Sequence, residues 1–300
     1  MREIIVVGGG HAGCEAALAA ARMGRSVTLI TLRAESIGTM PCNPSVGGLG
    51  KGHLVREVDA LGGVMGSAAD AAGLHFRLLN RSKGPAVRGP RVGCDREAYA
   101  QWMQATIAAE RSIEILEEEV VALIRDRDRC AGVVTEQSGS LPAEATVITG
   151  GTFLAGRLHE GLEVRPGGRI DEPPSNRLGA ALRDMGLKTG RLKTGTPPRL
   201  DAESIAHEEC TLQPGDQPPV FLSDMTEGLT SPQIPCHLTA TTPRTAAFLQ
   251  ARLHLTPTYG GRVKGRGPRN CPSIEDKVVR FPGRSSHTIF LEPEGRNSAL

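Results

Sequence analysis

The feature that most constrains the fold is a glycine-rich loop near the start of the chain. Gly8, Gly10 and Gly13 stand at GxGxxG spacing, directly after the apolar run Ile4–Val7 and at the start of an alanine-rich stretch. In a strand–turn–helix unit the first glycine allows the tight turn, the second lets the backbone approach a pyrophosphate, and the third lets the helix pack on its strand. The helix start also offers unpaired N–H groups to phosphate charge. The loop therefore predicts a Rossmann-like α/β domain that binds an adenine dinucleotide.

The first half of the chain continues this α/β pattern. Residues 26–31 form a second apolar run after Gly24, which stands in the usual place past a helix end. Short strands are predicted at 113–116, 120–124, 132–135 and 145–149, with an antiparallel excursion that returns to the parallel sheet. Apolar spacing predicts three more helices. The first covers 53–61 and has Leu54, Val58 and Leu61 on one face. The second is capped by Asp95 and carries Tyr99, Trp102, Met103, Thr106 and Ile107 on one face, and the third is capped by Ser175 and carries Leu178, Leu182 and Met185.

The composition excludes several classes of protein. The seven cysteines, at positions 14, 42, 94, 130, 210, 236 and 271, contain no CxxC pair, which argues against a disulfide framework, a structural zinc site and a thiol oxidoreductase. The histidines show no metal-ligand spacing, so we expect no metal. The chain opens on Met1 without a basic and apolar leader, and it has no apolar run near the length of a bilayer span. We therefore expect a cytoplasmic protein that does not enter a membrane.

The glycine spacing by itself leaves the identity of the dinucleotide open. The acid that usually holds the adenosine ribose should end the second strand, where this chain has Thr31, Leu32 and Arg33, with Glu35 as the nearest acid. An arginine there suits the 2′-phosphate of NADP, so the spacing does not choose among FAD, NAD and NADP. The second glycine-rich run, at 47–52, lacks the Ser or Thr of a nucleotide triphosphatase loop after its lysine.

Two cysteines and one basic stretch are candidates for chemistry and binding. Cys42 lies just before the second glycine-rich run, and Cys271 follows two arginines that favour a thiolate, whereas Cys14 and Cys130 fit inert core positions. The basic stretch could attract phosphates, although a solvated face explains its charge as well. It consists of Arg157, Arg165, Arg169, Arg177, Lys188, Arg191, Lys193 and Arg199.

Several longer strings of residues resemble one known family. They are GGGHAG at 8–13, PCNP at 41–44, GKGHLV at 50–55, EVDALGG at 57–63, SKGPAVR at 82–88, RLKTGTPPR at 191–199, CPSIEDKV at 271–278 and EPEG at 292–295. In this order, and from the first strand to the last residue, they closely resemble the MnmG (GidA) family. That family consists of flavoproteins that work with a GTPase of the MnmE type to add a carboxymethylaminomethyl or aminomethyl group at C5 of uridine 34, the wobble uridine, in tRNA.

The resemblance implies a set of cofactors and partners. It chooses FAD as the bound dinucleotide, with NADH as its reductant, and a folate on the GTPase partner as the source of a methylene group. It also implies a homodimer that joins its partner in a heterotetramer, and a role for the basic stretch in contacting tRNA.

The resemblance also implies roles for particular residues. The FAD contacts would be Gly8, Gly9, Gly10, His11, Ala12, Gly13, Val120 and Ser175. The stretch assigned to NAD would be Gly267, Pro268, Arg269, Asn270, Cys271, Pro272, Ser273, Ile274, Glu275, Asp276, Lys277, Val278, Val279, Arg280 and Phe281. Cys42 and Cys271 match two cysteines proposed to take part in catalysis, one of which would add to the pyrimidine and thereby activate C5.

Family members are considerably longer than 300 residues, so we interpret the chain as the amino-terminal portion of the family fold. We expect an incomplete Rossmann-like FAD-binding domain over 1–195 and an inserted, smaller, loop-rich α+β domain associated with NAD over 196–280. Residues 281–300 would return to the FAD domain, and the carboxy-terminal part of the fold would be absent. The alternative to an enzyme is a non-catalytic fragment that at most binds FAD.

Overall fold

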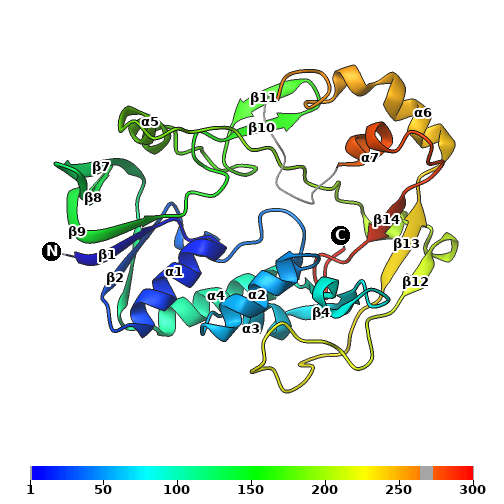
Figure 1. Ribbon diagram of the computed structural model, residues 1–300, viewed down its shortest axis with the longest axis horizontal. Coiled ribbons are helices and arrows are strands. Elements are labelled where there is room, and N and C mark those ends of the chain that lie inside the picture. The colour runs from blue at the N-terminus through cyan, green and yellow to red at the C-terminus, as the bar shows by residue number, and fades with distance from the viewer. Residues whose placement is uncertain (1, 264–272, 300) are drawn as a thin grey trace.

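The computed structural model describes residues 2–263 and 273–299, and its largest element is a six-stranded sheet. The strand order is β6-β2-β1-β9-β8-β7 (Figure 1). β6, β2, β1 and β9 run parallel, and β9, β8 and β7 are joined antiparallel, so the predicted excursion is confirmed. The strands are β1 Arg2–Val7, β2 Val27–Thr31, β6 Ile113–Glu117, β7 Val120–Asp126, β8 Arg129–Thr135 and β9 Gly139–Ile148.

Alternate residues of the central strands face two separate hydrophobic clusters, as the two-residue period of a strand requires. Val6 and Leu29 join a cluster with residues of α1 (His11–Arg22) and α4 (Arg96–Ala109). Ile5 and Ile30 join a second cluster with β7, β8, β9 and α5 (Asn176–Asp184). The parallel strands are therefore covered on both faces, which explains why their sequences are apolar throughout.

The predicted helix ends are confirmed at two of three positions. Gly24 has a φ of 75° just past α1, and the Asp95 carboxylate accepts from the amides of Glu97 and Ala98 at the start of α4. Ser175 does precede α5, but its side chain makes no capping hydrogen bond, so this detail of the prediction is wrong. The Ser175 backbone pairs instead with that of Phe153 and Ala155, which holds it outside the usual cap geometry.

A second, three-stranded sheet lies beside the first, and the predicted helix at 53–61 packs on it as α2. The sheet is formed by β3 (Ser45–Gly47), β5 (Gly89–Cys94) and β4 (Gly73–Leu79), with α2 (Lys51–Ala60) and α3 (Met65–Ala71) against it. The predicted apolar face of α2 points to solvent, since Leu54 is 60% exposed and Leu61 is 84% exposed. α2 packs instead through Gly52 and Val55, because Gly52 lies so close to Pro90 that a Cβ would stand 2.3 Å from the Pro90 oxygen.

The second half of the chain is rich in loops, as its prolines predicted. A hairpin of β10 (Arg157–Glu160) and β11 (Glu163–Pro166) precedes α5, and α6 spans Pro243–Ala251. β12 (Thr211–Gln213), β13 (Cys236–Ala240) and β14 (Thr288–Leu291) form an antiparallel sheet, and α7 (Ile274–Arg280) lies before β14. Residues 281–300 first add strand β14 to the sheet of the inserted region, because β14 pairs with β13. Glu292 and Glu294, which follow β14, then pair with Arg91 and Arg96 in the first part of the chain. The domain boundaries themselves remain a prediction.

Glu118 ties the turn between β8 and β9 to the end of β6, and its contribution to stability is expected to depend on pH. Its carboxylate accepts from the Ser138 hydroxyl and from the amides of Ser138 and Gln137. These hydrogen bonds, the Ser138 hydroxyl first, lower its pKa from 4.5 to about 2. A lowered folded-state pKa stabilises the fold above the unfolded value, and this contribution disappears as the pH falls through the folded value.

We therefore expect Glu118→Gln to unfold at a lower urea concentration than the unmodified chain at neutral pH. The gap between the two midpoints should narrow as the pH falls from about 4.5 towards 2. Glu144→Gln is the matched control, because Glu144 is an exposed carboxylate on the neighbouring β9. A gap for Glu118→Gln that stayed constant down to pH 2 would contradict this assignment.

Candidate functional site

The glycine loop, residues 8–13, joins β1 to α1 and has the close approaches that its spacing predicted. Gly8 has a φ of 107°, a conformation that favours glycine. A Cβ on Gly13 would stand 1.7 Å from the Gly8 oxygen, so the helix packs directly on the end of its strand. At Gly10, by contrast, a Cβ would meet no atom of the chain within 4 Å. The middle of the loop is thus open at the start of α1, where first-turn amides have no partner within the helix.

The other predicted FAD contacts lie at the same edge of the main sheet as the glycine loop. β1 lies between β2 and β9, so the chain continues from β1 to one side of the sheet and later returns to the other side. Open α/β sheets bind ligands at the carboxyl ends of the strands at such a position. Val120 begins β7, Ser175 precedes α5, and one hydrophobic cluster contains Val7, Val120 and Leu178. The structure therefore brings together three segments that are far apart in sequence. Their contacts with FAD remain a prediction.

Thr149 is a residue of this site that sequence reasoning missed. Its hydroxyl lies 2.8 Å from the Val7 oxygen and 3.0 Å from the Gly8 oxygen, and its amide donates to the Val7 oxygen. It thus fixes the start of the glycine loop from the end of β9. No local signal marks a threonine for this role, because its partners lie more than a hundred positions away in the sequence.

His11, the first residue of α1, packs against the ring of Tyr99. Its Nδ1 lies 3.3 Å from the Tyr99 hydroxyl, and the two rings meet edge to face with centroids 5.4 Å apart. Burial raises the pKa of the Tyr99 hydroxyl well above its usual range. Burial, together with the charge of Arg169, lowers the pKa of His11. The lowered pKa disfavours a positive charge on this histidine beside the glycine loop.

The Cys42 loop is built from segments that the sequence presents separately. The Cys42 thiol donates to the Gly195 oxygen over 3.4 Å and to Asn43 Oδ1 over 3.3 Å. Arg199 donates through Nη2 to the Cys42 oxygen over 2.7 Å. The structure thus brings the string at 191–199 onto the string at 41–44. The thiol is half-buried, within reach of a molecule that approaches the loop.

Two glutamates, Glu292 and Glu294, act as a carboxylate clamp on this region (the Glu292–Glu294 clamp). Glu294 pairs with Arg96 over 2.7 Å and with Arg199 over 2.8 Å, and Arg96 also donates to the Met40 oxygen. Glu292 accepts two hydrogen bonds from the Arg91 guanidinium on β5, one of them over 2.9 Å. Burial disfavours the charge on Arg91, but Glu292 beside it holds the pKa of the guanidinium above its usual range. The clamp therefore joins the end of the chain to the base of the Cys42 loop.

Breaking the Arg91–Glu292 pair is expected to destabilise the fold strongly. The Arg91 and Glu292 side chains are only 22% and 16% exposed, so Arg91→Met would leave a carboxylate buried without its partner. The expected loss is about 3 kcal/mol of unfolding free energy, measured by urea denaturation. Arg91→Met combined with Glu292→Met should recover part of the loss. Arg125→Met, which removes the exposed pair with Asp128, should change stability by less than about 1 kcal/mol. A double variant no more stable than Arg91→Met would argue against the pairing.

Nine of the fifteen residues assigned to NAD, 273–281, are among the described residues, and Cys271 is not. Gly267, Pro268, Arg269, Asn270, Cys271 and Pro272 lie outside the described residues. Ser273 caps α7 together with Asp276, and Phe281 follows the helix. Asp276 also accepts from the Tyr259 hydroxyl over 2.8 Å and pairs with Lys193 over 3.4 Å. Burial opposes the charge on Asp276, but Tyr259, the Ser273 amide and Lys193 together lower its pKa. α7 is thereby anchored to the string at 191–199.

The remaining cysteines of the described ranges divide by burial. Cys14, Cys94 and Cys236 are buried, and burial raises the pKa of all three thiols, of Cys14 and Cys236 to about 12. They are unreactive at neutral pH. Cys130 is partly exposed on β8, so the expectation of a core position for it is wrong, whereas that for Cys14 is confirmed.

Ion pairs already occupy much of the predicted basic stretch. Arg165, Arg169, Arg177, Lys193 and Arg199 pair respectively with Glu160, Glu172, Glu136, Asp276 and Glu294. Arg191 donates to the Ala155 oxygen. The attraction of this stretch for a polyanion is therefore weaker than its sequence alone indicates.

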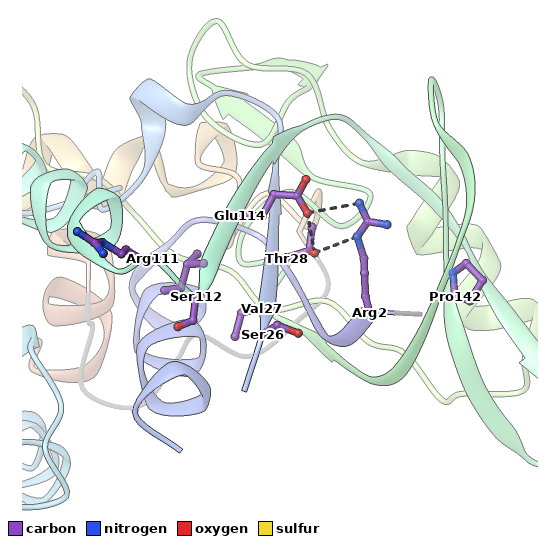
Figure 2. Close-up of a pocket in the computed structure, with 9 residues that line it drawn as sticks. Arg2, Ser26, Val27, Thr28, Arg111, Ser112, Glu114 and Pro142 are labelled. Atoms are coloured by element: carbon purple, nitrogen blue, oxygen red, sulfur yellow. Dashed lines mark hydrogen bonds and ion pairs between the residues drawn. The ribbon is translucent and has the colours of Figure 1, made fainter. Parts of the chain in front are cut away.

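A hollow of about 620 Å³ lies at the opposite edge of the main sheet (Figure 2). Its walls come from the amino ends of β1, β2 and β6, and Figure 2 shows Arg2 directed at Thr28 and Glu114. Arg2 donates to Thr28 Oγ1 over 2.9 Å and pairs with Glu114 over 3.4 Å. Because the charge of Arg2 is paired and parallel sheets bind ligands at their carboxyl ends, this hollow is not the dinucleotide site.

Two kinds of feature are absent from residues 2–263 and 273–299. No helix there is long and apolar enough to cross a membrane. These ranges also contain no group of three or more His, Cys, Asp or Glu side chains placed to hold a metal ion.

Comparison with known proteins identifies the family. A family model described as glucose inhibited division protein A matches residues 3–300. The tRNA uridine 5-carboxymethylaminomethyl modification enzyme MnmG of Syntrophotalea carbinolica is 49% identical over 98% of this chain and 47% of its own length. Two crystal forms of Aquifex aeolicus GidA, 44% and 42% identical, superpose with TM-scores of 0.92 and 0.90 over 99% of this chain and 51% and 48% of theirs. This chain spans about half the length of these relatives. Its α/β fold, its glycine loop and these matches together show that the chain belongs to the GidA family.

Proposed function

We propose that this chain is part of an FAD-dependent enzyme that modifies uridine 34 of tRNA at C5. The observation that carries the proposal is the open space at Gly10 beside the first-turn amides of α1, in a chain 49% identical to a tRNA uridine 5-carboxymethylaminomethyl modification enzyme. A dinucleotide pyrophosphate fits this loop, because the glycine backbone admits it and the amides oppose its charge. When bound, FAD supplies the redox chemistry of the modification, with NADH as reductant.

The residues of the chain hold and orient the reactants in this proposal. The glycine loop binds the pyrophosphate, while Val120 and Ser175, at the same edge of the sheet, contact the rest of the dinucleotide. Cys42 is proposed to lose its thiol proton to solvent and to add through sulfur to C6 of the uracil ring. The S–C6 bond forms as the C5–C6 double bond breaks, and the electron pair moves to C5 and the C4 oxygen, which makes C5 nucleophilic. The same role is open to Cys271, which lies outside the described residues. The hydrogen bond from Arg199 to the Cys42 oxygen keeps the loop in place during this step.

The partners in this proposal follow from the family. A methylene group would come from a folate bound to a GTPase of the MnmE type, and the chain would act as a homodimer joined to that partner in a heterotetramer. Arg157, Lys188 and Arg191 form no ion pair among the described residues and are the basic side chains most available to tRNA phosphates. A cytoplasmic location, where tRNA is processed, belongs to the same proposal. So does the association of residues 267–281 with NADH.

The absorbance spectrum of the purified chain tests this function. FAD is added, unbound FAD is removed, and NADH is then added without oxygen. A retained flavin spectrum that NADH bleaches would support a working cofactor site within these 300 residues. A folded chain that retains no flavin would favour the alternative, a fragment without activity. An equal amount of free FAD carried through the same steps without protein controls for incomplete removal.

A further inference from the structure

The end of β2 carries an arginine where dinucleotide-binding domains usually carry an acid, and this arginine is paired. Arg33 Nη2 lies 3.2 Å from Glu172 Oε1, and Arg33 Nη1 lies 3.4 Å from Glu35 Oε1. An acid at this place holds the adenosine ribose, whereas an arginine accommodates a 2′-phosphate. The carboxylate that the second strand lacks is therefore supplied by a residue more than a hundred positions away.

Glu172 is fixed in place, unlike Glu35. It closes a tight turn in which the Gly168 amide donates to the Glu172 oxygen and the Glu172 amide donates to the Arg169 oxygen, each over 3.1 Å. Its Oε2 accepts from Arg169 Nε over 3.2 Å and from Nη2 over 3.0 Å. The Glu172 side chain is 14% exposed and that of Glu35 is 75% exposed. Glu172 is therefore the fixed carboxylate beside Arg33, whose own side chain is 51% exposed.

This turn lies at the same edge of the sheet as the glycine loop. The segment that carries it begins at Thr149, which bonds the Gly8 oxygen, and it ends at Ser175, whose amide donates to the Phe153 oxygen. The Arg169 guanidinium lies 5.4 Å from the centre of the Phe153 ring within that segment. Arg33 and Glu172 thus stand beside the end of β2, where the adenosine ribose of a bound dinucleotide is expected.

We infer that Glu172 is a specificity-determining residue that makes this site select adenine dinucleotides without a 2′-phosphate. The inference rests on the proposed function, since it concerns the same dinucleotide site. The Glu172 carboxylate pairs with the Arg33 guanidinium, which would otherwise bind the 2′-phosphate. The negative charge of Glu172 also repels a phosphate dianion. The structure thereby resolves the choice that Arg33 leaves open in the sequence, in favour of FAD or NAD over NADP.

The test compares two probes that differ only by the phosphate, ADP-ribose and 2′-phospho-ADP-ribose. Their dissociation constants are measured by calorimetry at low ionic strength with the flavin-free chain. The unmodified chain is expected to bind ADP-ribose more tightly. Glu172→Gln should improve binding of the 2′-phospho form relative to ADP-ribose by about tenfold, the size of one charge-assisted hydrogen bond. Arg33→Ala added to Glu172→Gln should abolish that gain. Glu35→Gln is the matched control and should change the ratio by less than about twofold.

Three outcomes would overturn the inference. The first is an unchanged ratio in Glu172→Gln with ADP-ribose binding intact, and the second is a gain that survives the removal of Arg33. The third does not require Glu172→Gln to fold: if Arg33→Ala alone weakened the 2′-phospho form by about tenfold, Arg33 would already be available to phosphate. Failure of the unmodified chain to bind either probe would instead overturn the dinucleotide site, and the proposed function with it.

Discussion

A Gly13→Asp variant of the chain is expected to purify without flavin. The Cβ of any residue at position 13 would stand 1.7 Å from the Gly8 oxygen and 2.8 Å from Thr149 Oγ1, so α1 must move away from β1. The aspartate would also place a negative charge at the helix start, where the pyrophosphate charge is expected. The absorbance of the purified variant after addition of FAD measures the effect, with the unmodified chain as reference. Full flavin content in Gly13→Asp would remove the glycine loop from the proposed site.

Gly10→Ala separates loss of the ligand from loss of the fold. A Cβ at position 10 meets no atom of the chain within 4 Å, so the thermal unfolding midpoint should stay unchanged. The methyl group would enter the space proposed for the pyrophosphate, and the affinity for FAD should fall by about tenfold or more. Gly228→Ala is the matched control, because Gly228 is an exposed glycine of the loop-rich second half whose Cβ would also meet no atom within 4 Å. Reduced affinity in Gly10→Ala with an unchanged midpoint would show that the open space is used by the ligand.

Cys42→Ala is expected to abolish modification of uridine 34 while leaving flavin bound. The proposed step needs a nucleophilic sulfur, and loss of a covalent nucleophile costs at least about a thousandfold in rate. The loop should keep its place, because Arg199 bonds the backbone oxygen of Cys42 rather than its side chain. The measurement is mass spectrometry of tRNA nucleosides with a chain of the relatives' length, the GTPase partner, folate and NADH.

Cys210→Ala is the matched control for Cys42→Ala, since Cys210 is also partly exposed but lies in the loop-rich region. It should keep full activity. Modification that persisted in Cys42→Ala with normal flavin content would assign the nucleophilic role to another residue, with Cys271 as the next candidate. Loss of flavin in Cys42→Ala would indicate that the thiol supports the fold of the loop instead.

Local sequence determined the elements around the glycine loop because each carries its own signal. The apolar run at 4–7, the glycine spacing and Gly24 predicted β1, α1 and the turn after it, and the alternating short strands predicted the excursion through β7 and β8. The face of α2 with Leu54, Val58 and Leu61 is left towards solvent because Gly52, not a large side chain, makes the contact with β5. The spacing of apolar residues shows which residues share one face of a helix, but it does not show which face packs against another element.

The sequence by itself determined the Rossmann-like start, the glycine loop at residues 8–13 and, through its long strings, the family. Each of these depends on residues within one turn, helix or ordered motif. Only the tertiary structure decided that Glu294 pairs with Arg96 and Arg199, that the 191–199 string lies on Cys42, and that Glu172 neutralises Arg33. These contacts join segments up to about two hundred positions apart, and their formation depends on how the strands are ordered in the sheets. A charge is visible in a sequence, but its partner is set by the packing of the whole chain.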